Sequence, residues 1–425
     1  MWEKLKQAWQ VKEVREGLLF VLAMMVIFRI AANIPLPGID LVALKQFFQT
    51  NQLLGLLNLF SGGTISNFSI VALGVAPYIT ASIIFQLLGM IVPRIEEIQK
   101  EGEQGRQKIN QWTRWLTVPL SIIQSFGLLQ ILQQSQVPIL TNTNTLHIVT
   151  IITTVTAGTM FLMWMGELMS ERKVGNGLSL LIFAGIVSGL PSSAGQFLST
   201  FDTTQWVQLA VYAAVAIAMV VGVVFVTEGQ RNVPIQYARA SRASGGAIGG
   251  VATSLPLRVN MTGVIPIIFA ISLLVFPSMI AQFFSRARSP WLSQAATWVI
   301  VTLQNQWVYG ALYLLLVVGF TYFYTAIVFQ PDKIAENLQK QGGFVPGIRP
   351  GKPTSEYLQA VINRINLGGA LFLGLIAVTP LIAQGATGST VLALGGTSLL
   401  IVVSVVIESV KQIESQLTMR QYDAY

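Results

Sequence analysis

The sequence predicts an all-α polytopic membrane protein, and three features carry that prediction. Only 10% of the 425 residues are charged and 53% are hydrophobic, whereas a soluble domain carries about a quarter charged residues. Several stretches of roughly 20 residues contain no charge, which is the length that a helix needs to cross a bilayer core of about 30 Å. The basic residues also fall into alternate loops, as the positive-inside rule requires.

The apolar stretches give ten spans, and all of them except Leu18–Asn33, which contains Arg29, are free of charge. Six stretches hold one span each: Leu18–Asn33, Ile70–Val92, Leu178–Leu190, Trp206–Thr227, Thr262–Phe284 and Tyr309–Phe329. Two longer stretches hold two spans each. Trp115–Gly166 is divided by the polar segment Gln133–Thr145, and Leu367–Ile407 is divided at Gln384–Thr390.

The distribution of charge fixes the orientation of these spans. With both ends of the chain in the cytoplasm, 22 of the 26 Lys and Arg residues lie on the inner side and three on the outer side. The first sixteen residues carry Trp2, Leu5 and Trp9 among mixed charges, which predicts an amphipathic helix on the inner membrane face. We therefore expect a multi-pass protein with cytoplasmic N- and C-termini.

One uncharged segment does not fit this count of spans. Residues 46–93 contain no charge, but a further span there would export the basic segments that follow. Leu53–Phe68 is therefore predicted to enter the membrane and return on the outer side, with a half-helix that ends near Ser61–Thr64. Such backbone survives at membrane depth only inside protein or beside a water-filled cavity. The segment is either a plug in an aqueous vestibule or a segment packed on the outer surface.

Most catalytic chemistry is excluded by composition. The chain has no cysteine and one histidine, which removes thiol chemistry and cysteine-based metal sites. His147 begins a span beside an outer turn, and we expect it to have a packing or interfacial role. The span interiors lack the ionisable residues that mark proton relays, because Arg29, Glu167 and Glu408 all lie near span ends. We expect neither an enzyme nor a bound cofactor.

The inner segments 228–260 and 331–364 are long, basic and poor in apolar residues. They could merely set topology and touch anionic lipid. However, Phe344–Gly351 (FVPGIRPG) is rich in Pro and Gly and would present Arg349 on a constrained turn. A projecting basic platform suits an RNA surface or an acidic protein partner.

Motifs along nearly the whole chain resemble those of the SecY family of protein-translocation channels. In chain order they are Phe28–Ile30 with Ile34–Asp40, Phe60–Gly63, Ala72–Gly74 with Pro77–Ile79, Lys100–Glu103, Gly175–Gly177, Asn260–Pro266, Phe344–Gly351 and Gly395–Ile401. The resemblance implies a passive channel for unfolded polypeptide. It also implies two five-span halves, residues 1–203 and 204–425, around a central hourglass pore.

The resemblance also implies roles for particular residues. The family's pore ring matches Val75, Ile79, Leu178, Ile182, Ile268 and Ile401. The plug matches the re-entrant half-helix with Leu56, Phe60, Ser61, Gly62, Gly63 and Phe68. The lateral gate lies between spans two and three and spans seven and eight, where Gln86 and Gln124 are the candidate polar residues. The resemblance implies that Arg349, together with Arg231, Arg239 and Arg242, docks the ribosome or SecA. The 228–260 loop is less basic than in many relatives.

By this resemblance the partners are SecE and SecG in a heterotrimer, the SecA motor ATPase, the ribosome, secretory polypeptides with their signal peptides, and membrane lipid. The location is the bacterial plasma membrane or, alternatively, a thylakoid membrane. The signal peptides and membrane spans of substrates would leave sideways into lipid.

Two rival hypotheses are an ion-coupled secondary transporter with a broken helix and a membrane assembly factor without a pore.

Overall fold

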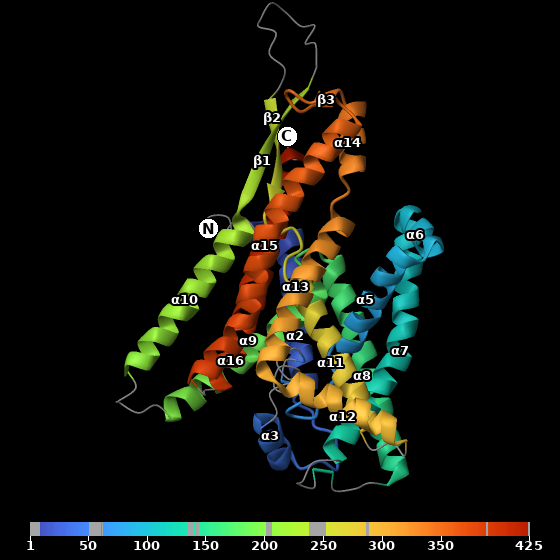
Figure 1. The fold of residues 1–425 in the computed structure, drawn as a ribbon, viewed down its shortest axis with the longest axis vertical. Helices are drawn as coiled ribbons and strands as arrows, with labels where there is room; N and C mark the ends of the chain where they lie inside the picture. Colours follow the sequence, from blue (N-terminus) through green and yellow to red (C-terminus); the bar gives the residue numbers. More distant parts are fainter. Residues whose placement is uncertain are drawn as a thin grey trace, which may run out of the picture.

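The computed structural model describes residues 9–50, 61, 63–133, 139–140, 144–200, 206–237, 252–285, 289–387 and 390–423. Most of these residues are helical, and the long helices run along one axis in an elongated bundle (Figure 1). Ten helices coincide one to one with the ten predicted spans: α2 (Lys12–Ala32), α5 (Ala76–Ile91), α7 (Glu103–Gln133), α8 (Thr145–Glu171), α9 (Gly177–Thr200), α10 (Trp206–Glu228), α11 (Ile265–Phe284), α13 (Gln306–Val328), α15 (Lys352–Thr387) and α16 (Thr390–Asp423).

Length and composition alone mark four helical segments within the described residues as able to cross a membrane. They are Glu103–Gln133, Thr145–Glu171, Gln306–Lys340, which includes the helix after α13, and Lys352–Thr379. A fifth span is possible where Ala76–Ile91 meets Pro93–Gln99 at a bend of 108°. Shorter apolar helices cover Gly177–Pro191, Ala213–Glu228 and Ile265–Ser278. The predicted helical membrane architecture is therefore confirmed by the described elements.

The second predicted span starts later than expected. The prediction was Ile70–Val92, but α5 begins at Ala76, and the residues before it form turns. Pro77 lies in the first turn of α5, where its missing amide hydrogen costs no helical bond. Val75 is consequently the N-cap residue of the helix. At the other end, Pro93 starts the short helix α6 (Pro93–Lys100) after the bend.

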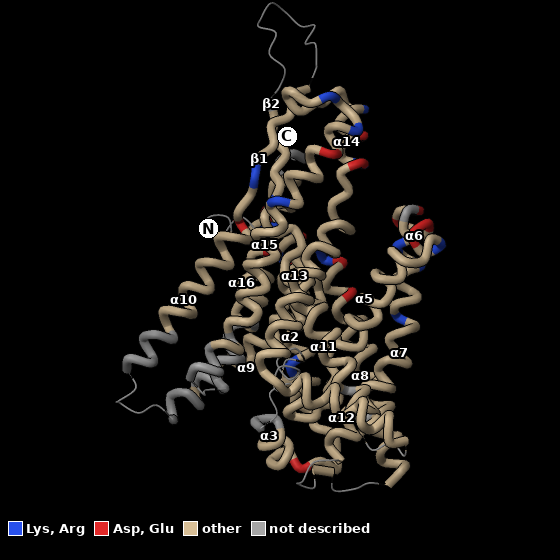
Figure 2. Tube along the Cα trace, viewed as in Figure 1, with Lys and Arg blue, Asp and Glu red and all other residues tan. Residues whose placement is uncertain are grey.

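Within the described residues, four shorter helices lie outside the predicted spans: α3 (Leu41–Thr50), α6, α12 (Pro290–Gln304) and α14 (Pro331–Lys340). In Figure 1, α3 and α12 lie at one end of the bundle, and α6 and α14 lie toward the other. Charged residues gather around α6, α14 and the neighbouring strands (Figure 2). This asymmetry agrees with the charge distribution from which the orientation was predicted.

The segments 228–260 and 331–364 contain a small sheet that was not predicted. Strand β1 (Gln230–Tyr237) pairs antiparallel with β2 (Ala252–Arg258) and with β3 (Gly343–Phe344), in the order β2-β1-β3. Val233, Ile235 and Leu257 are buried, which gives the alternation of period two that a half-buried strand requires. The three strands, α14 and the beginning of α15 thus form a folded platform with its own core, which includes Val233, Leu257, Val345 and Leu358.

The first and last long helices meet beside this platform. Val14 of α2 and Leu417 of α16 are buried in one small cluster with Val11, Leu18 and Ile413. Gln416 Nε2 donates to the carbonyl oxygen of Lys173 at 2.7 Å, and Lys411 pairs with Glu228 of α10 at 2.8 Å. The predicted N-terminal amphipathic helix lies partly outside the described residues, which begin at residue 9.

A close approach between α8 and the turns before α5 depends on Gly158. A Cβ at this position would overlap the carbonyl oxygen of Ile70 and crowd Val71. The two backbones can therefore pack only if residue 158 has no side chain.

We expect Gly158→Ala to lower the free energy of unfolding by about 1–3 kcal/mol, as overpacking of a tight core does. Thermal unfolding of the purified protein in detergent measures the effect. Gly319→Ala is the matched control, because a Cβ at this helical glycine of α13 meets no atom within 4 Å. Equal stability of the two variants would contradict this account of the α8 contact.

Candidate functional site

The six predicted ring residues come together in one hydrophobic cluster at the centre of the bundle. Val75 and Ile79 come from the start of α5, Leu178 and Ile182 from α9, Ile268 from α11 and Ile401 from α16. Val75, Ile182, Ile268 and Ile401 are buried, whereas Ile79 and Leu178 are partly buried. The first and last of these residues, Val75 and Ile401, are 326 positions apart in the sequence, so only the fold brings them together.

Two cavities meet at this cluster. One is lined by Ser61, Val75, Ile79, Gln124, Leu128, Ile131, Ile268, Ile271, Ser272 and Val275, among others. The other is lined by Tyr78, Ile79, Ser82, Gln86, Asn176, Leu178, Ser179, Ile182, Ile265, Ile268, Phe269 and Tyr324. Ile79 and Ile268 line both cavities, so these two side chains lie between them. The two cavities are therefore separated by aliphatic side chains.

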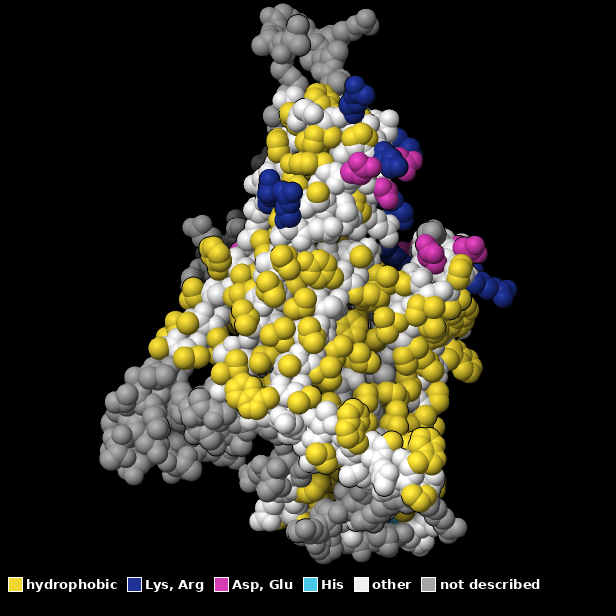
Figure 3. All heavy atoms as spheres, in the orientation of Figure 1, with side chains coloured by type: hydrophobic (Ala, Val, Ile, Leu, Met, Phe, Trp, Pro, Cys, Tyr) yellow, Lys and Arg dark blue, Asp and Glu magenta, His cyan; other side chains and the backbone are white. Residues whose placement is uncertain are grey.

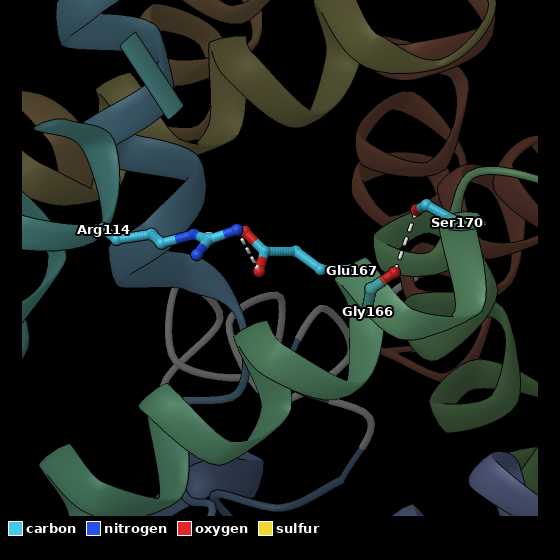
Figure 4. Close-up of polar contacts among 4 residues, drawn as sticks. All are labelled: Arg114, Gly166, Glu167 and Ser170. Carbon is cyan, nitrogen blue, oxygen red and sulfur yellow. Dashed lines mark hydrogen bonds and ion pairs between the residues drawn. The ribbon is translucent and has the colours of Figure 1, made fainter. Parts of the chain in front are cut away.

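Polar groups at the start of α9 fix the position of the ring residue Leu178. Asn176 Oδ1 accepts from the backbone N–H of Leu178 at 3.1 Å and of Ser179 at 3.3 Å, which satisfies two amides of the first helical turn. The N–H of Gly177 donates to Ser170 Oγ at 2.9 Å. Ser170 Oγ itself donates to the carbonyl oxygen of Gly166 at 2.9 Å (Figure 4). The Gly175–Gly177 motif thereby ties α9 to the end of α8.

A charge pair joins α7 to α8 near the second cavity. Arg114 Nε and Nη2 each lie 2.8 Å from an oxygen of Glu167, in the bidentate arrangement of Figure 4. The side chain of Arg114 is 50% exposed and that of Glu167 is 23% exposed. Solvent screens a pair this open, so its contribution to stability is below about 1 kcal/mol.

The described end of the re-entrant segment borders the first cavity. Ser61 is buried and lines this cavity, and Thr64 Oγ1 lies 2.8 Å from Ser61 O and 3.0 Å from Ala72 O. Gly63 lies in the turns that follow. Phe68 is buried elsewhere, in a second cluster that includes Leu44 and Leu132. Leu56, Phe60 and Gly62 lie outside the described residues.

The predicted gate residues lie on opposite sides of the ring. Gln86 lines the second cavity and donates from Nε2 to Ser82 Oγ at 3.0 Å. Gln124 is buried and lines the first cavity. Helix α11 contacts both α5 and α7, so the predicted seam between these helices is closed in this structure.

Arg349 is exposed on a turn at the edge of the platform. The turn contains Gly347 with φ +82° and ends at Gly351 with φ +92°, a backbone region that favours glycine. Thr354 Oγ1 donates to the carbonyl oxygen of Arg349 at 2.8 Å, and Val345 anchors the turn in the platform core. Arg231 is exposed on β1, whereas Arg239 and Arg242 lie outside the described residues.

Sequence reasoning missed part of the cavity lining on α11. Ile271, Ser272 and Val275 line the first cavity beside Ile268. They follow Ile268 at intervals of three, four and seven residues, which places them on the same helix face. That spacing was available in the sequence once Ile268 was chosen.

The remaining chemistry of the site is neutral. His147 packs against Gly38, in keeping with a packing role. The described residues contain no group of three or more His, Cys, Asp or Glu side chains that could hold a metal ion.

The fold and the site define a multi-pass helical membrane protein whose two cavities are separated by an apolar constriction, which is the form of a gated channel.

Comparison with known proteins identifies the family. A family model described as SecY matches residues 69–410, and the chain belongs to the SecY family. Protein translocase subunit SecY of Streptomyces scabiei is 42% identical, with 99% of this chain and 98% of the relative aligned. The Corynebacterium glutamicum subunit is also 42% identical, over 98% of both chains. The chain is a protein-conducting channel subunit and not an enzyme, and none of these likenesses supports an ion-coupled transporter.

Solved structures share the fold at low sequence identity. One described as a protein-conducting channel matches with a TM-score of 0.62 and 17% identity, covering 93% of this chain and 91% of the other. A second, from work on the SecY plug domain, gives a TM-score of 0.63 at 17% identity and the same coverage. The channel of a canine ribosome–channel complex matches with a TM-score of 0.59 at 16% identity, covering 93% of this chain and 91% of that one.

We expect the Arg114–Glu167 pair to couple weakly despite its bidentate geometry. A double-mutant cycle with Arg114→Gln, Glu167→Gln and the double variant, read by thermal unfolding, should give a coupling below about 1 kcal/mol. The cycle on Lys12 and Glu16, an exposed pair within one helix with a distance of 3.9 Å, is the reference. A coupling above about 2 kcal/mol would mean that the pair is shielded from solvent by a neighbour.

Proposed function

We propose that the ring of Val75, Ile79, Leu178, Ile182, Ile268 and Ile401 is the constriction through which unfolded polypeptide crosses the membrane. The observation that carries this proposal is that Ile79 and Ile268 line both cavities. A polypeptide leaving one cavity for the other passes these side chains. Aliphatic groups close around a chain of any sequence without holding it through hydrogen bonds.

The re-entrant segment acts as the plug on the outer side of this ring. Two features support that role: Ser61 borders the first cavity, and the segment has no charge to anchor it in either aqueous phase. The lateral gate is the seam between α5 and α7 on one side and α11 and α13 on the other, with Gln86 and Gln124 beside it. Separation of α11 from α5 and α7 would open the cavities to lipid, so that signal peptides and membrane spans leave sideways.

The channel has ten spans in two halves, residues 1–203 and 204–425, with both termini in the cytoplasm of a bacterium and the spans in its plasma membrane. The basic residues on one side support this orientation, and the named relatives are bacterial. The ring draws on both halves, since α5 and α9 precede residue 204 and α11 and α16 follow it.

The chain works with SecE and SecG, and the SecA motor or a ribosome supplies the energy. The solved canine relative is a ribosome–channel complex, which supports docking at the corresponding end of this chain. Arg349 is the main docking residue because its turn is held rigidly at the exposed edge of the platform. Arg231 on β1 adds to the same basic surface, and Arg239 and Arg242 belong to the adjoining loop.

Photocrosslinking tests the pore. Crosslinkers at positions 79, 182, 268 and 401 should each label a secretory chain arrested during translocation, because the chain fills the constriction. A crosslinker at Leu315, which is 65% exposed on α13, is the control and should label lipid. Labelling at Leu315 without labelling at any of the four ring positions would refute the pore.

A charge reversal tests the docking turn. We expect Arg349→Glu to reduce export at least tenfold while the protein remains inserted and folded, because the partner loses a basic contact and meets a repulsive one. The rate at which a secretory precursor is processed in cells measures export. Lys352→Glu is the matched control: it is exposed three residues away, and an acidic side chain is tolerated at the start of α15. Equal export in the two variants would remove Arg349 from the docking surface.

A further inference from the structure

Helix α12 presents a row of tryptophans that the channel function does not explain. Trp291 and Trp298 are 71% and 69% exposed, and Trp307 at the start of α13 is 81% exposed. Trp291 and Trp298 are seven residues apart, which places them on one stripe of the helix. Three of the nine tryptophans of the chain are thus exposed within a short segment at the end of the bundle away from the charged platform (Figures 1 and 2).

The circumference of α12 has three zones. Ala296 and Leu303 are buried, and Val299 packs against the central cluster. At 100° per residue, the polar residues Ser293, Thr297 and Gln304 lie about 110° around the helix from the packed zone. The two tryptophans form the third zone, about equally far from the packed zone and the polar zone. A side chain with an apolar ring and one N–H donor suits that zone when a bilayer lies on one side and water on the other.

The surroundings of α12 favour lipid over a protein partner. No Lys, Arg, Asp or Glu occurs from residue 289 to residue 331, so the face offers no charge to specify a protein. The exposed apolar surface continues from this end of the bundle along the long helices (Figure 3). Trp112 and Trp115 are exposed on α7 toward the opposite end, which gives the chain tryptophans at both levels, as in an aromatic belt.

Helix α12 is also tied to α11. It packs against α11 and α13, and Ser293 Oγ donates to the carbonyl oxygen of Ser285, the C-cap residue of α11, at 2.7 Å. Any contact that fixes α12 therefore restrains the end of the helix that carries Ile268.

We propose that α12 binds the outer headgroup–acyl boundary of the bilayer through Trp291 and Trp298, and that this contact anchors the outer end of α11. The bound ligand is the lipid surface itself. The interaction needs no particular headgroup, because it rests on indole rings and burial of apolar area.

The absence of cysteine from the chain makes spin labelling a clean test. Trp298→Cys and Thr297→Cys, each carrying a nitroxide, are compared in the full channel complex, made with cysteine-free partner subunits and reconstituted in vesicles of phosphatidylethanolamine and phosphatidylglycerol. Relaxation by oxygen reports lipid, and relaxation by a water-soluble nickel chelate reports water. We expect the ratio of oxygen to nickel accessibility to be severalfold higher at position 298 than at position 297.

The spin-label experiment has three possible outcomes for the proposed contact between α12 and the bilayer. A higher ratio at 298 that falls when the vesicles are replaced by a polymer-stabilised soluble form supports the proposal. Equal and high nickel access at both positions would place α12 in water and overturn it. A label at 298 that is shielded from both reagents would show a protein on this face, a second copy or another subunit, and would also overturn it. Because the variants leave the ring intact, this test can fail while the crosslinking test of the pore succeeds.

Discussion

The arrangement of the site depends on a non-helical segment that satisfies its own backbone groups at the centre of the bundle. Between Thr64 and Val75 the chain forms turns, although non-helical backbone at membrane depth is tolerated only where protein or water surrounds it. The amide of Ser69 donates to Thr64 O at 3.0 Å, that of Ile70 to Ile34 O at 3.1 Å, and that of Leu36 to Phe68 O at 2.9 Å. Each such bond contributes about 1 kcal/mol net, and leaving a buried amide unpaired costs about 1–3 kcal/mol.

This segment sets the positions of its neighbours. The segment ends at Val75, which is the N-cap residue of α5, and this places Ile79 one turn into that helix. Its first described residue, Ser61, lies at the cavity, and its middle lies against α8 at Gly158.

The sequence predicted the long helices well because lipid imposes a simple rule: a span must be apolar, free of charge and about 20 residues long. Helix α12 was not predicted, because it is apolar but too short to cross the bilayer. The region between two predicted spans was treated as a loop. The sheet was missed although Val233 and Ile235 alternate with polar residues, because the high content of Arg, Ser and Gly nearby suggested an open loop. In both cases the spacing of apolar residues within a short segment indicated the element, whereas the search for long apolar spans did not detect it.

The ring could not be predicted from physical chemistry alone. Ile268 and Ile401 have the same side chain as any packed isoleucine, and only the resemblance to a family singled them out. Phe68 was assigned to the plug by the same resemblance. Its ring is buried in one cluster with Leu44 and Leu132, which holds the end of the segment in place.

The length of helix α15 has a mechanical consequence. Its first 28 residues, Lys352–Thr379, precede Pro380 and extend about 42 Å at 1.5 Å per residue, which is longer than the hydrocarbon core of a bilayer is thick. It begins directly after the turn that carries Arg349 and packs against α13 along its course. A partner that grips this turn therefore holds one end of a stiff rod, and a tilt applied outside the membrane reaches the helices inside it without passing through a flexible joint.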